Sequence, residues 1–227
     1  MRSFRAWFLA LLLALLWLAW PFLRPRLWPA PGSPWLVVLD GYHRLDLALE
    51  LQRRRHLPIL LISCPATGQP TAAQWRRATA PLLVLREGFD TASQMAALGR
   101  WWPHRQPSLP HGLPATLPAV LPTTLPVDLT VAPVEVWLVT DPSHLPRARL
   151  AAQIALGAAG TRVWPQPAPL PGTAPPMAAS PAPLANWPLW RDALRLQLWR
   201  LSGSTGAFLQ PAVLSRKISI CQGQPTP

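Results

Sequence analysis

Lysine and acidic residues are scarce in this 227-residue chain. Lys217 is the only lysine among 21 basic residues, and nine acidic residues leave a formal net charge of +12. Arginine in place of lysine, with abundant Ala, Pro and Trp, is typical of coding from GC-rich DNA. No basic helix with interleaved aromatic residues and no zinc-finger or RNA-binding motif occurs, so we predict no nucleic-acid partner. A basic surface beside anionic lipid headgroups explains the charge more simply.

Cysteine is also rare, with only Cys64 and Cys221. Two cysteines exclude a disulfide scaffold and a CxxC metal site. The five histidines show no metal-ligand spacing, so we predict no metal centre. We interpret Cys64 as a small buried residue at the end of a strand.

One long hydrophobic run is present, from Ala6 to Leu23, without a charged residue. As a helix it is roughly 27 Å long, close to the thickness of a bilayer's hydrocarbon core, about 30 Å. Tryptophans near its ends fit the membrane interface. We therefore predict a short stub and a single-pass transmembrane anchor over residues 1–28.

A cleaved signal peptide is the alternative. Its apolar core would be shorter and would end in small residues at the −3 and −1 positions, whereas Trp28 stands two places before Ala30. Arginines flank the hydrophobic run on both sides, so the charges alone do not decide on which side of the membrane the domain lies.

Apolar strands alternate with helical patterns after a Pro/Gly linker at 29–34. This order predicts an α/β fold, a Rossmann-like three-layer parallel sheet, over 35–206. The predicted strands are 35–39, 59–63, 82–85, 134–140 and 161–164. The predicted helices are 45–55, 71–80, 90–100 with Asp90 as N-cap, 145–156 ended by Gly157, and 189–202.

Proline-rich segments interrupt this pattern. A Leu-Pro-x-x repeat fills residues 109–126 within a predicted insertion at 103–133, and proline every fourth residue excludes both helix and sheet. A second Pro/Ala-rich stretch, 165–188, is adjacent to the last strand and could cover a site. Residues 207–227 are interpreted as a tail.

Polar residues that follow the strands are the candidates for a ligand site, because parallel sheets bind ligands at their carboxyl ends. These candidates are Asp40, Gly41, Arg44, Ser63, Glu87, Asp90, Thr91, Thr140, His144 and Arg147. They form no recognisable nucleophile–base triad, and they identify no reaction.

His144 and Arg147 are the most informative pair. They stand at a helix start, where free backbone N–H groups and the helix dipole attract anions. Arg147 is a bidentate donor for carboxylate or phosphate, and His144 titrates near neutrality. Ser143 could cap the helix. The alternative is structural: His144 only begins the helix, Arg147 pairs with Glu87, and Asp90 and Thr91 only cap the next helix.

The chain resembles the bacterial SanA/ElyC/YdcF family of envelope proteins, a YdcF-like domain of cyanobacterial type. The resemblance covers residues 35–202. It is carried by Leu36–Leu39 with Gly41 and Arg44, by Ile59–Ser63, by Glu87 with Asp90 and Thr91, and by the specific run Val139–Ala148. Cys64 and Gln94 stand where the family has Gly and Asn.

The resemblance implies a Rossmann-like domain behind a membrane anchor, with a role in cell-envelope or peptidoglycan-related biogenesis. It also implies that His144 and Arg147 line the site, and S-adenosylmethionine is a cofactor considered for some members. We therefore expect a domain on the periplasmic side of the plasma membrane that binds an anionic small ligand. The alternatives are a non-catalytic envelope interaction protein and an S-adenosylmethionine-binding enzyme.

Overall fold

The computed structural model describes residues 2–39, 42–63, 70–88, 90–102, 132–168 and 187–205. Asp40 and Gly41, nearly all of the predicted 103–133 insertion and the predicted 207–227 tail lie outside these ranges. The Pro/Ala-rich stretch at 165–188 is described only at its two ends.

Five short strands form one sheet, as predicted. Their order is β3-β2-β1-β4-β5 and every pairing is parallel. The strands are β1 (Trp35–Leu39), β2 (Ile59–Ile62), β3 (Leu82–Leu85), β4 (Glu135–Thr140) and β5 (Arg162–Pro167). β1 and β2 are buried along their whole length, as expected for strands covered on both faces.

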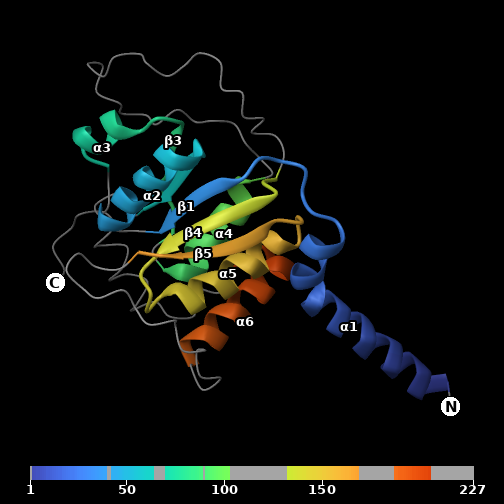
Figure 1. Cartoon of the computed structure of the whole chain (residues 1–227). Helices are drawn as coiled ribbons and strands as arrows, with labels where there is room; N and C mark the ends of the chain where they lie inside the picture. The colour runs from blue at the N-terminus through green and yellow to red at the C-terminus, as the bar shows by residue number, and fades with distance from the viewer. Residues whose placement is uncertain are drawn as a thin grey trace, which may run out of the picture.

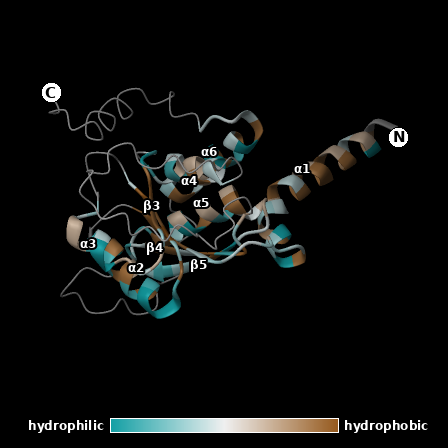
Figure 2. Cartoon of the chain, turned by 90° about the horizontal axis from the view of Figure 1, so that it is seen from above, coloured by the Kyte–Doolittle hydropathy of each residue, from teal (hydrophilic) through white to brown (hydrophobic). Residues whose placement is uncertain are grey.

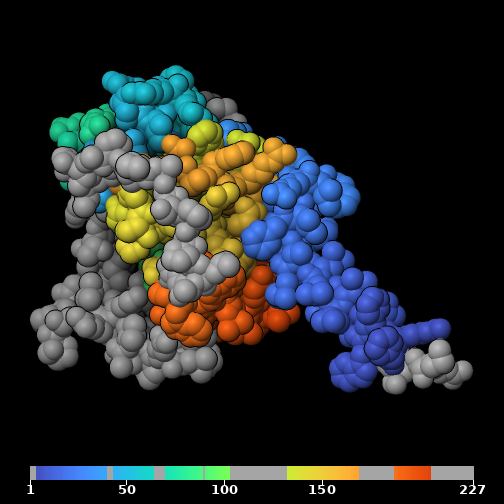
Figure 3. All heavy atoms as spheres, turned by 60° about the horizontal axis from the view of Figure 1, so that its bottom comes forward, coloured from blue at the N-terminus to red at the C-terminus, as the bar shows by residue number. Residues whose placement is uncertain are grey.

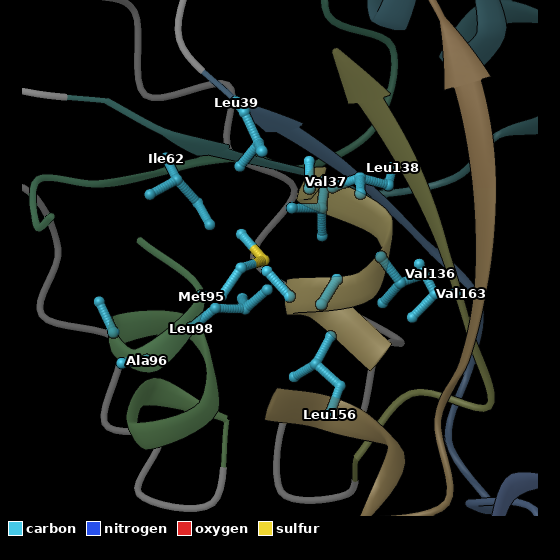
Figure 4. Packing of buried hydrophobic residues seen from close by; sticks show 14 of the residues in the cluster. Val37, Leu39, Ile62, Met95, Ala96, Leu98, Val136, Leu138, Leu156 and Val163 are labelled. Atoms are coloured by element: carbon cyan, nitrogen blue, oxygen red, sulfur yellow. The ribbon is translucent and has the colours of Figure 1, made fainter. Parts of the chain in front are cut away.

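Helices cover both faces of the sheet (Figure 1). They are α2 (Tyr42–Arg55), α3 (Ala72–Arg77), α4 (Thr91–Trp101), α5 (Leu145–Gly157) and α6 (Trp187–Ser202). Alternate residues of a strand point to opposite faces. Val37 and Leu39 therefore join the core beneath α4 and α5 (Figure 4), whereas Leu36 and Val38 join the core beneath α2. The α6 helix packs on α4 and α5.

Several predicted helix bounds differ from the structure. The α2 helix begins at Tyr42 instead of residue 45, and α6 begins at Trp187 instead of residue 189. The α3 helix ends at Arg77, because Ala78 is extended, instead of continuing to residue 80. Gly157 does not terminate α5 with a left-handed residue; it is the last helical residue, and Gly160 takes the positive φ, at +94°. The predicted Asp90 cap of α4 is confirmed, since its side chain accepts a hydrogen bond from the Ser93 N–H.

The N-terminal helix α1 (Arg2–Leu27) projects from the domain (Figures 1 and 2). Its segment Phe4–Leu27 is long and apolar enough to cross a membrane. The exposed side chains of its first half are large and hydrophobic, while its second half packs against α5. The helix thus has a protruding part and a docked part.

Two prolines explain how the docked part is held. A proline within a helix leaves the carbonyl four residues earlier without its N–H donor. Pro21 thereby frees the carbonyl of Trp17, which accepts a hydrogen bond from Arg200 of α6 at 3.3 Å. Pro25 frees the carbonyl of Pro21, which accepts from Nε2 of Gln153 of α5 at 2.7 Å. The helix breakers of α1 are therefore also its attachment points.

Close backbone approach reinforces this docking. A Cβ atom on Gly157 would lie 2.0 Å from the Pro21 carbonyl oxygen, so only glycine lets α1 come this near to α5. The segment predicted as a linker is bound as well: the Ala30 N–H donates to Gly160 at 2.9 Å, and Gly32 donates to Ala132 at 3.1 Å. The chain from α1 to β1 is therefore fastened to the domain.

Candidate functional site

The sheet reverses its order beside β1. From β1 the chain adds β2 and β3 on one side and then returns to place β4 on the other side. In such folds, ligands bind in the crevice outside the carboxyl ends of the two strands at this switch point. Four described side chains with ionisable groups follow these strands: His43 and Arg44 after β1, and Asp141 and His144 after β4.

Asp141 joins the two sides of the switch point. It accepts from Nε of Arg44 at 3.0 Å, its second oxygen pairs with the same guanidinium, and its Oδ1 lies 2.8 Å from Nε2 of His43. Arg44 also donates to the Leu39 carbonyl at the end of β1. Partial burial would raise the pKa of Asp141, but hydrogen bonds from Arg44 and His43 outweigh it and lower that pKa. The carboxylate is therefore ionised.

His144 occupies the N-cap position of α5, where Ser143 had been considered. Its side chain makes no capping hydrogen bond and is exposed. Desolvation and the positive charges of Arg147 and Arg44 lower its pKa, against a smaller opposite effect of Asp141. Near neutral pH the imidazole is therefore uncharged, in a positive local potential beside a helix N-terminus.

Arg147 lies beside this group but has partners of its own. Its Nη2 donates to Oγ1 of Thr91 at 2.7 Å, and its Nε is 3.2 Å from Oδ2 of Asp192. The Nε–H is not aligned for a hydrogen bond, so the second contact is an ion pair only. The alternative of a pair with Glu87 is wrong: Glu87 is exposed and pairs with Arg100 at 3.5 Å.

Asp192 of α6 is the centre of a buried charge network, with only 1% of its side chain exposed. It lies 3.0 Å from Arg191 and 3.7 Å from Arg195, in addition to Arg147. Arg195 also forms an ion pair with Asp90, the N-cap of α4, with 2.8 Å between its Nη1 and Oδ2 of Asp90. Burial would raise the pKa of Asp90, but the bonds from Arg195 and Ser93 lower it. This network fastens α6 to the N-terminal ends of α4 and α5.

The remaining predicted residues fall into two groups. Ser63 and Thr140 are buried at the ends of β2 and β4, and Thr91 is buried at the start of α4. Asp40 and Gly41 lie outside the described residues, so their place in the site stays a prediction.

The structure therefore brings together Arg44 and His144, with Arg147 next to them, and places Glu87 apart from Arg147. Sequence reasoning missed His43 and Asp141, although both stand directly beside predicted candidates. A carboxylate immediately after a buried strand was the available signal. Within the described residues, no group of His, Cys, Asp and Glu side chains is arranged to hold a metal ion.

The chemistry open to this arrangement is recognition of negative charge. Arg44 is held in place by Asp141, and His144 can both accept and donate hydrogen bonds. Comparison of the chain with protein-family models, curated proteins and solved structures finds no match.

Proposed function

We propose that this chain is a single-pass membrane protein whose α/β domain binds an anionic small ligand at the β1/β4 switch point. The observation that carries the proposal is His144, an exposed imidazole at the N-cap of α5 whose neighbours Arg44 and Arg147 make the local potential positive. An anion at this position would interact with the helix dipole, with both guanidinium groups and with a protonatable imidazole.

Membrane anchoring is supported by α1 and by its attachment. A cleaved signal peptide would be removed from the domain, yet the Trp17 and Pro21 carbonyls are bound by Arg200 and Gln153 of the folded core. Ala30, at the position where cleavage was considered, is 3% exposed and is bonded to Gly160. These contacts favour a retained anchor.

A role in cell-envelope biogenesis, with the domain on the periplasmic side of the plasma membrane, rests on the resemblance of residues 35–202 to the SanA/ElyC/YdcF family. A reporter fused after Pro227 tests the orientation. Activity of a periplasm-dependent reporter supports the proposal, and activity of a cytoplasm-dependent reporter contradicts it.

Ligand binding is tested with the full chain in lipid nanodiscs. Thermal stabilisation is measured with inorganic phosphate, nucleotides and nucleotide-linked cell-wall precursors. We expect at least one anion to stabilise the protein, and His144→Asn to weaken its binding about tenfold, the loss of one charge-assisted contact of roughly 1.4 kcal/mol. His56→Asn, at an exposed histidine after α2, is the matched control and should bind normally.

Two outcomes separate the proposal from its alternatives. Stabilisation by no member of the panel would favour the non-catalytic interaction protein. Binding of S-adenosylmethionine in calorimetry, with loss in His144→Asn, would favour the S-adenosylmethionine-binding enzyme.

A further inference from the structure

The apolar face of the α6 helix points toward solvent instead of toward the protein core. Its large apolar residues Trp187, Trp190, Leu194, Leu198 and Leu201 recur every three or four positions and therefore share one face, the α6 stripe. This face points outward: its side chains are between 46% and 70% exposed. The opposite face carries the buried Asp192 and Leu196.

The α6 stripe lies close to the base of α1. The C-terminal half of α6 touches α1 directly, through Arg200 to the Trp17 carbonyl and Gln197 to the Leu18 carbonyl, at 3.3 and 3.5 Å. The Arg200 guanidinium also stacks over the Trp17 ring at 4.2 Å. Figure 3 shows α6 at the surface beside the base of α1.

The length of α1 indicates what covers the stripe. Contacts with α6 begin at Trp17, so only the uncharged stretch 6–16 projects freely, roughly 17 Å of helix. A hydrocarbon core is about 30 Å thick. Residues 17–23 must therefore also lie at membrane depth, and the end of α6 that touches them reaches the membrane surface.

The composition of α6 fits that surface. Tryptophan is favoured at the boundary between headgroups and acyl chains, and arginine near anionic lipids. Two tryptophans stand in the first turn of α6, and Arg191 and Arg200 flank the stripe. Its one acidic residue, Asp192, is buried among arginines, so α6 presents no negative charge to lipid headgroups.

We propose that the α6 stripe lies in the headgroup–acyl boundary of the bilayer that α1 crosses, so that the domain contacts the membrane at two places. This inference rests on the membrane anchoring proposed above. The occupant of the stripe is lipid, and α6 lies along the membrane surface as an interfacial amphipathic helix.

The test uses nitroxide labels on the full chain in liposomes with anionic lipid. Leu194→Cys and Leu198→Cys are labelled singly in a background with Cys64→Ser and Cys221→Ser. Collision with lipid-soluble oxygen is compared with collision with a water-soluble nickel chelate. Leu12→Cys, in the projecting part of α1, is the membrane reference, and Arg54→Cys, exposed on α2, is the aqueous reference.

We expect labels at 194 and 198 to collide more with oxygen than with nickel, as at 12, and the label at 54 to show the reverse. If the label at 194 collides with nickel as often as the label at 54 does, the inference about α6 is overturned. A label at 12 that still reports lipid would then leave the proposed membrane anchoring by α1 intact. Low collision with both reagents at 194 would mean a protein partner or a second copy, and would also overturn it. A label at 12 that reports water would instead contradict the anchoring itself.

Discussion

Arg44 and Asp141 pair across the switch point of the sheet, connecting the helix that follows β1 to the loop that follows β4. The two residues are 97 positions apart in the chain. Because Arg44 also binds the Leu39 carbonyl, the pair holds one of the two guanidinium groups beside His144 in a single orientation.

Removing the negative charge of this pair should destabilise the domain. In Asp141→Asn, Arg44 and His43 keep one neutral carbonyl acceptor but lose the carboxylate charge and its second oxygen, and we expect a loss of about 1–3 kcal/mol in the free energy of unfolding. Urea unfolding of the full chain in detergent measures it. The control is Asp46→Asn, which breaks the exposed pair with Arg77 and should cost less than about 0.5 kcal/mol. Equal losses in the two variants would contradict a structural role for the Asp141 pair.

Anion binding should depend on pH through His144. The pKa of the free imidazole is lowered by desolvation, Arg147 and Arg44, whereas a bound anion favours the protonated form and raises it. Binding therefore takes up a proton, and affinity should rise as pH falls from about 7 to 5. Calorimetry with sulfate, whose charge does not change in this range, measures this trend at several pH values. If the affinity of His144→Asn depends on pH as strongly as that of the wild type, the proton is taken up by another group.

Mutation of Asp192 should destabilise the domain more than mutation of Asp141. Asp192→Asn leaves three arginines at the junction of α4, α5 and α6 without their central carboxylate, and we expect a loss of about 3 kcal/mol or more. Thermal unfolding by circular dichroism measures it. Glu50→Gln, which removes an exposed carboxylate beside Arg53 and Arg54, should leave the midpoint nearly unchanged. A neutral effect at Asp192 would mean that the arginines find other partners.

Acid should destabilise the domain through Asp90 and Asp141. Both have a lowered pKa in the folded state, so the stability they contribute is present above the unfolded-state value of about 3.9. It is lost as pH falls below about 4, through the folded-state values. The free energy of unfolding should therefore decline as pH falls below about 4, with a smaller slope in Asp141→Asn. An identical slope in that variant would exclude Asp141 as a contributor.

The contact between α1 and α5 should not tolerate a side chain at Gly157. In Gly157→Ala, the new methyl group would collide with the Pro21 carbonyl and displace it from Gln153, at a cost of about 1–3 kcal/mol. Hydrogen exchange should show loss of protection at the Ala30 and Gly32 amides. Ala159→Ser adds one atom at an exposed position of the same turn and is the control. Unchanged protection in Gly157→Ala would show that the segment is held independently of α1.

Local patterns were sufficient for the fold. Continuous apolar runs predicted the first three strands, and Asp90 with Ser93 three residues later is a recognisable helix start. The partner of Arg147 could not be predicted in this way. Glu87 follows another strand of the same sheet, but β3 and β4 are separated by β2 and β1. The carboxylate that Arg147 meets comes from α6, whose position depends on how it packs on α4 and α5.

The outward orientation of the apolar face of α6 could not be predicted from the sequence either. Trp190, Leu194, Leu198 and Leu201 recur at helical spacing, but periodicity alone does not say whether such a face turns toward a protein core or toward another apolar environment. Proline in the hydrophobic run was visible in the sequence, yet its role depends on Gln153 and Arg200 reaching the carbonyls it frees.

One helix, α5, connects the candidate site with the proposed anchor: His144 stands at its first end and Gly157, against α1, at its last. The two are separated by roughly 20 Å of continuous helix. In the proposed membrane-spanning arrangement, a bilayer thinner than the hydrophobic length of α1 would make that helix tilt. Since α1 is hydrogen-bonded to α5, the domain would tilt with it, and the position of His144 relative to the lipid surface would change. Under the proposed anchoring, membrane thickness would therefore set the direction from which a molecule can reach His144.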